Sequence, residues 1–305
     1  MSTAPRAAAH ELALRSVMPE FWRWWAGIEH ASLDQQADGF WAGIVRAHPE
    51  LYSTSVMGQK FGDETYARAK IRAYFEKLPS HVEDMRSISA RMPELLRTGY
   101  ARFSAAFPDV QWHGPVYVMP SLFNFDGGTR LIDGKPQLVF APDGIALYHA
   151  MDSKPDGPCA FFAHELFHIY HQQFFASAPD TETAVWQLLW TEGLATYVGA
   201  QLCPHATEAE VFISATLAID VPPKLALYAR ELRGQTGSTE DKILTRWFTA
   251  GTTGDVPSRA GYYLGYQVAR RAARTYSLQQ LARLDGPTVR ALIDAELDAL
   301  ARDGK

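Results

Sequence analysis

Two histidines four residues apart, with a glutamate directly after the first, form the pattern HExxH at His164, Glu165 and His168. The pattern lies in an apolar run of helix length, and on a helix both imidazoles project from one face and can share a metal ion. On such a helix the side chain of Glu165 points about 100° away from that of His164. From there a carboxylate can take a proton from a metal-bound water and pass it to a leaving amine. The pattern therefore predicts metal-assisted hydrolysis with one zinc ion per chain.

A catalytic zinc site needs a third protein ligand, and Glu192 is the strongest candidate. It is the only charged residue between Glu182 and Glu208 and lies among large apolar residues, where a carboxylate should be paired or coordinated. Residues 177–181 are typical of a short turn, which lets two helices pack antiparallel and returns Glu192 to the histidines. The alternative is a structural glutamate bonded to a neighbouring Trp or Tyr. His171 lies too far along the histidine stripe to be the third ligand.

HELFH, followed after 23 residues by the Glu of WTEGLATY, resembles the gluzincin arrangement of zinc peptidases. More narrowly, it is similar to an uncharacterised bacterial family of predicted zinc-dependent proteases. The likeness extends to residues 127–129, to GYYLGY at residues 261–266 and to the aromatic segment that begins at Phe21. At Thr196 the sequence departs from the best-known gluzincins, which carry there an Asp that orients a histidine. The partners that orient the ligands thus stay open, with His171, Thr191 and Tyr197 as candidates.

The resemblance implies a zinc metallopeptidase that acts on a peptide or protein substrate. The implied zinc ligands are His164, His168 and Glu192, and the implied general base is Glu165. It also implies that an edge strand binds the substrate backbone, although from sequence alone the glycines at residues 127 and 128 are more typical of an ordinary hairpin turn.

Zinc peptidases of this type add a neutral Tyr or His that stabilises the developing oxyanion. The candidates here are Tyr262, Tyr263 and Tyr266, with His149 as an outsider. Adjacent helix positions point about 100° apart, so at most one of Tyr262 and Tyr263 faces the cleft. We favour Tyr263, and the alternative is that all three tyrosines are ordinary core residues.

Apolar periodicity defines the elements that must position these residues. Helical spacing over residues 20–107 predicts a helical N-terminal lobe, and β-branched residues with Asp-Gly turns predict a small antiparallel sheet over residues 112–150. The helical pattern then returns and continues to Ala301. Together with the resemblance, this predicts an α+β, mostly helical protein with a thermolysin-like core. We expect a lobe at residues 1–110 and a catalytic region at residues 111–305, as two domains or one continuous domain.

Composition excludes several classes of protein. A net charge of −5 over 305 residues argues against a nucleic-acid partner, and no apolar run approaches the roughly 20 residues of a membrane span. The N-terminus lacks the apolar core of a secretory signal, so we expect the cytoplasm. Cys159 and Cys203 fall near opposite ends of two antiparallel helices and could approach each other. In that compartment, however, we expect free thiols.

Two rival functions use parts of the same sequence. One is a catalytically silent, zinc-stabilised interaction protein. Structural zinc sites usually have four ligands rich in Cys, whereas two His and one Glu leave a position open, which favours an enzyme. The other is a partner-binding helical module built on the aromatic segment from Phe21 to Trp25, although Trp at helical spacing is more often core.

Overall fold

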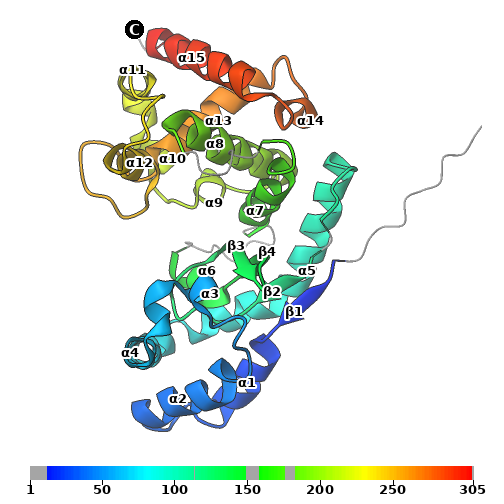
Figure 1. Cartoon of the computed structure of the whole chain (residues 1–305), viewed down its shortest axis with the longest axis vertical. Helices are drawn as coiled ribbons and strands as arrows, with labels where there is room; N and C mark the ends of the chain where they lie inside the picture. The colour runs from blue at the N-terminus through cyan, green and yellow to red at the C-terminus, as the bar shows by residue number, and fades with distance from the viewer. Residues whose placement is uncertain (1–11, 113, 149–157, 176–182, 304–305) are drawn as a thin grey trace, which may run out of the picture. The chain divides into compact units, whose positions relative to one another are not determined.

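The computed structural model describes residues 12–112, 114–148, 158–175 and 183–303. Helices dominate these residues, and one small sheet supplies the β part (Figure 1). The chain forms two compact units, one of residues 1–101 and 112–151, the other of residues 102–111 and 152–305. No helix in the described part of the chain is long and apolar enough to cross a membrane.

The first unit contains a mixed four-stranded sheet rather than the expected antiparallel one. Its strands are β1 (Leu14–Ser16), β2 (Val116–Val118), β3 (Gly127–Ile132) and β4 (Lys135–Phe140), in the order β1-β2-β4-β3. Only β3 and β4 are antiparallel, joined by a hairpin turn at Asp133 and Gly134. Because β4 lies between β2 and β3, it pairs with β2 in parallel. On the other side of β2, β1 is also parallel to it.

The other elements of the first unit are helical. They are α1 (Met18–Ala26), α2 (Leu33–Phe40), a π-helical turn (Trp41–Val45), α3 (Thr54–Met57), α4 (Glu64–Lys77), α5 (Val82–Ala106) up to residue 101, and α6 (Pro142–Tyr148), with 3₁₀ turns at Gln59–Gly62 and Leu78–Ser80. The last turn of α5, residues 102–106, belongs to the second unit. Phe21 and Trp25 are buried, and the Trp25 ring stacks 5.6 Å from Phe75. The aromatic segment of α1 therefore belongs largely to the core.

The sheet packs with these N-terminal helices, whereas we expected it in the catalytic region from residue 111 onward. The Tyr52 hydroxyl donates to the Pro120 carbonyl at 3.1 Å, and the Asn124 amide donates to the Met57 carbonyl at 3.2 Å. β1, near the N-terminus, completes this sheet, so residues 112–151 group with the N-terminal helices in one compact unit.

The second unit is helical. It contains α7 (Cys159–His171), α8 (Val185–Leu202), α9 (Glu208–Phe212), α10 (Leu217–Asp220), α11 (Leu225–Arg233), α12 (Asp241–Phe248), α13 (Ala260–Ala272), α14 (Leu278–Leu281) and α15 (Gly286–Asp303), with a 3₁₀ turn at Pro222–Lys224. α8 packs against α7 and against α13, so three helices surround one core.

Candidate metal centre

The helices α7 and α8 lie antiparallel and close together because small residues face each other between them. A Cβ atom on Gly199 would lie 2.6 Å from the carbonyl oxygen of Ala160, so only glycine permits this approach. Almost every side chain of α7 is buried, as its apolar sequence predicts. The expected turn at residues 177–181 lies outside the described residues.

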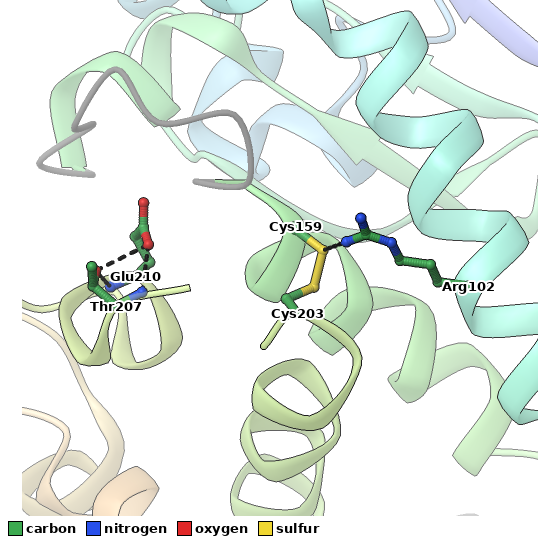
Figure 2. Close-up of a disulfide and its surroundings, with 5 residues drawn as sticks. All are labelled: Arg102, Cys159, Cys203, Thr207 and Glu210. Carbon is green, nitrogen blue, oxygen red and sulfur yellow. Dashed lines mark hydrogen bonds between the residues drawn. A yellow bond between two sulfur atoms is a disulfide. The ribbon is translucent and has the colours of Figure 1, made fainter. Parts of the chain in front are cut away.

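A disulfide joins the two helices at one end. Figure 2 shows Cys159, the first residue of α7, bonded to Cys203, the residue that follows α8. The Cα atoms are 5.9 Å apart, within the normal range for a disulfide. The prediction of free thiols is therefore wrong in this structure, because antiparallel packing brings the two helix ends together. The cytoplasmic location stays a prediction.

Three side chains from α7 and α8 converge on one point. The Nε2 atoms of His164 and His168 are 2.9 Å apart, and one carboxylate oxygen of Glu192 lies 3.3 and 3.4 Å from them. Ligands about 2.0–2.1 Å from a tetrahedral zinc ion lie about 3.3–3.4 Å from each other. The three residues therefore fit a zinc ion, and they form the one His, Cys, Asp and Glu group with metal-binding spacing in the described part of the chain.

The charges in this cluster are coupled. Burial lowers the pKa of His168, but the negative charge of Glu192 and its hydrogen bond outweigh burial and raise that pKa to about 9. Burial likewise raises the pKa of Glu192, but the charge of His168 and hydrogen bonds from both histidines hold it well below its ordinary value. A proton on His168 and the negative charge of Glu192 thus stabilise each other, and a bound cation would take the place of that proton.

Thr196 contacts His164 at Nδ1, the ring nitrogen that does not belong to the cluster. Its hydroxyl donates to the Glu192 backbone carbonyl at 2.8 Å and lies 3.4 Å from Nδ1 of His164. Since its proton is already donated, the oxygen is left to accept from an Nδ1–H group. That tautomer leaves the Nε2 lone pair of His164 free for a metal. Thr196 was not among the candidates that we expected to orient a ligand.

The three residues expected as candidates for orienting a ligand have partners away from the cluster. His171 is buried between the rings of Phe167 and Phe175, and burial lowers its pKa to about 3, so it is neutral. The hydroxyl of Thr191 donates to a carbonyl of its own helix, and the ring of Tyr197 packs on Tyr266.

Glu165 lies half-buried beside the cluster and is not one of its three members. Its negative charge contributes to the raised pKa values of His168 and Tyr262. A carboxylate near the metal position but outside the ligand set is the arrangement that a general base requires.

The structure brings Tyr262, and not Tyr263, to the cluster. The Tyr262 ring lies parallel to the imidazole of His164, with ring centres 6.2 Å apart, and its hydroxyl is hydrogen-bonded to Glu192. Tyr263 is buried, packs on Phe212 and is hydrogen-bonded to Gln267. The preference for Tyr263 therefore finds no support in its position. Tyr266 contacts Phe212 and Tyr197, and His149 lies outside the described residues.

Comparison with known proteins adds one match. Residues 116–286, more than half of the chain, match a family described as predicted Zn-dependent protease (DUF2268). The matched span contains α7, α8 and α13, and so every residue of the cluster. No curated protein and no solved structure matches the chain.

Proposed function

The chain belongs to this family of predicted Zn-dependent proteases, and from that premise we propose that it is a zinc metallopeptidase that hydrolyses peptide bonds. The observation that carries the proposal is the convergence of His164, His168 and Glu192 on one point. Three ligands leave one tetrahedral position for water or substrate, whereas a structural zinc site generally has four protein ligands. This favours an enzyme over a silent zinc-stabilised interaction protein.

Bound zinc would supply a Lewis acid for the peptide carbonyl and a water of lowered pKa. Glu165 would accept the proton of that water, hold it on its carboxylate and deliver it to the leaving amine. Its half-buried position next to both histidines supports this role.

We assign the oxyanion donor to Tyr262. Burial and the charge of Glu192 raise the pKa of the phenol, so it keeps its proton at neutral pH. A neutral donor beside the cluster can turn its hydrogen bond from Glu192 to a developing oxyanion. Thr196 would hold the His164 ring in place while this happens.

We further propose that α7 and α8 form a gluzincin-like, thermolysin-like core. The proposal is supported by the antiparallel pairing of the HExxH helix with a helix that carries the third candidate ligand. The close approach of Gly199 to the Ala160 carbonyl keeps these two helices in register.

The metal content of purified variants tests the function. We expect about one zinc per chain in the natural protein, and strong loss of zinc on His164→Ala or Glu192→Ala. Glu165→Gln should keep zinc but stop the cleavage of a mixed peptide library. His205→Ala, an exposed histidine of the same unit, is the control and should change neither. Full zinc content in Glu192→Ala, or cleavage that survives a chelator, would refute the proposal.

A further inference from the structure

One positively charged side chain lies beside the candidate metal centre without an acidic partner among the described residues. Arg259 directly precedes α13, and its guanidinium carbon lies 4.1 Å from the centre of the Tyr262 ring. Its Nη1 donates to the backbone carbonyl of Ile213 at 3.5 Å, the limit of a hydrogen bond. Most of the N–H groups of this guanidinium therefore have no acceptor in the part of the chain that the structure describes.

Four other half-buried arginines of the same unit behave differently. Each of the following four forms an ion pair with Asp or Glu: Arg233, Arg246, Arg271 and Arg290. Pairing is the expected state, because a guanidinium that loses water needs other partners. Arg259 departs from this pattern next to the residues that the proposed reaction uses.

The backbone around Arg259 is also unusual. Arg259 has a φ angle of 62° and Ile213 one of 49°, both in the left-handed region that L-residues disfavour, most of all β-branched ones. Such outliers persist where the surrounding structure holds a side chain in place, and they concentrate at functional sites. Arg259 combines such a backbone with a guanidinium that lies over the Tyr262 ring.

From these observations we propose that Arg259 binds a carboxylate of the peptide substrate, an inference that rests on the proposed peptidase function. The planar guanidinium fork suits a carboxylate, which can accept two parallel hydrogen bonds. A peptide can present such a carboxylate in two ways, at its C-terminus or on the side chain of an Asp or Glu.

Two distances limit how far the bound carboxylate can lie from the cleaved peptide bond. The guanidinium lies 4.1 Å from the Tyr262 ring centre, which lies 6.2 Å from the His164 ring centre, so the cation is at most about 10 Å from the first candidate ligand. An extended peptide spans about 3.3–3.6 Å per residue. The recognised carboxylate should therefore lie within about three residues of the cleaved bond.

Binding to an inactive protein tests the subsite without turnover. The probes are fluorescent peptides in matched pairs: a free C-terminus against a C-terminal amide, and Glu against Gln at each of three positions from the cleaved bond. They are titrated by anisotropy into zinc-loaded Glu165→Gln protein. We expect at least one acidic peptide to bind about 10–100 times more tightly than its neutral partner, as for a hydrogen bond to a charged group. The pair that shows the difference identifies the source.

Adding Arg259→Gln should abolish that preference, and Arg259→Lys should keep part of it. Arg274→Gln, an exposed arginine just beyond α13, is the matched control. Zinc content and melting temperature show whether each variant is folded. Equal affinity for every matched pair, or a preference that survives Arg259→Gln, would overturn the inference.

Kinetics on the natural protein separate the two proposals. A failure to cleave any peptide would count against the peptidase function, while the binding data still decide the subsite. If Arg259→Gln lowers kcat equally for acidic and neutral peptides, the arginine acts through Tyr262 and the subsite is refuted.

Discussion

Gly193 and Gly265 lie back to back where α8 crosses α13. A Cβ atom on Gly193 would lie 2.2 Å from the carbonyl carbon of Gly265, and one on Gly265 would lie 2.2 Å from the carbonyl oxygen of Leu189. The crossing stands one residue from Glu192 and three residues from Tyr262. Contact between the two backbones therefore sets the distance between a candidate metal ligand and the proposed oxyanion donor.

Replacing Gly193 with Ala should force α8 and α13 apart. Overpacked cores lose about 1–3 kcal/mol, and backbone atoms cannot move aside as a side chain can. We expect a loss of at least this size in the free energy of unfolding, measured with urea, together with lower activity. Gly254→Ala is the control, because nothing lies within 4 Å of its added Cβ atom. A Gly193→Ala protein as stable as the control would contradict the close crossing.

Tyr262→Phe removes the proposed donor and little else. We expect kcat to fall by about 100-fold or more, with KM and zinc content nearly unchanged. Tyr263→Phe is the adjacent control and should keep kcat, because its hydroxyl is hydrogen-bonded to Gln267. Steady-state kinetics on one peptide substrate compare the two. If Tyr263→Phe is the impaired variant, the oxyanion donor has been assigned to the wrong tyrosine.

Thr196→Val removes the hydroxyl that holds His164 while preserving the shape of the side chain. Loss of such an orienting contact typically costs about 10–100-fold in metal affinity. Competition with a chromogenic chelator should show weaker zinc binding by this factor, and Thr196→Ser should restore most of it. Unchanged affinity in Thr196→Val would mean that the 3.4 Å contact does not orient the ring.

Asp143 should make the first unit less stable as pH rises through the weakly acidic range. Burial raises the pKa of its carboxyl from 3.8 to about 6, despite hydrogen bonds from the backbone of Ser121 and Phe123. The folded state thus keeps this proton at a pH where the unfolded chain has lost it. Its contribution to stability is complete below about pH 4 and declines up to about pH 6, by about 3 kcal/mol at most.

Urea unfolding at several pH values isolates this effect. The stability of the natural protein relative to Asp143→Asn should fall as pH rises, because the amide does not titrate. Asp133→Asn, at an exposed turn position, is the control and should leave the pH dependence unchanged. A difference that stays constant with pH would refute the raised pKa.

Spacing and burial predict which three side chains come together in the cluster. Four residues make about one helical turn, so His164 and His168 must share a face. Glu192, alone among apolar residues, must find a partner. The choice between Tyr262 and Tyr263 does not follow from spacing. The choice depends on the rotation of α13 about its own axis. That rotation is set where the helix begins, at Arg259, which has a left-handed backbone conformation. An arginine in the sequence gives no indication of this conformation.

Contacts between distant segments explain what the sequence did not predict. β1 has three residues, too few for any periodicity, and its Leu14 pairs with Val116 about a hundred residues later. Cys159 and Cys203 look the same in the sequence whether bonded or free. Only the positions of the two helix ends decide the matter, so the state expected from the compartment is the wrong one.

The bond between Cys159 and Cys203 has a kinetic consequence. It closes a covalent ring of chain that contains both candidate histidines and Glu192. When the packing between α7 and α8 opens briefly, the ring keeps the effective concentration of these three side chains high around one another. A metal ion that left the proposed site would then meet ligands that are still close together, so rebinding would compete with escape. Under reducing conditions the disulfide would be absent, and the lifetime of a bound metal would depend on packing alone.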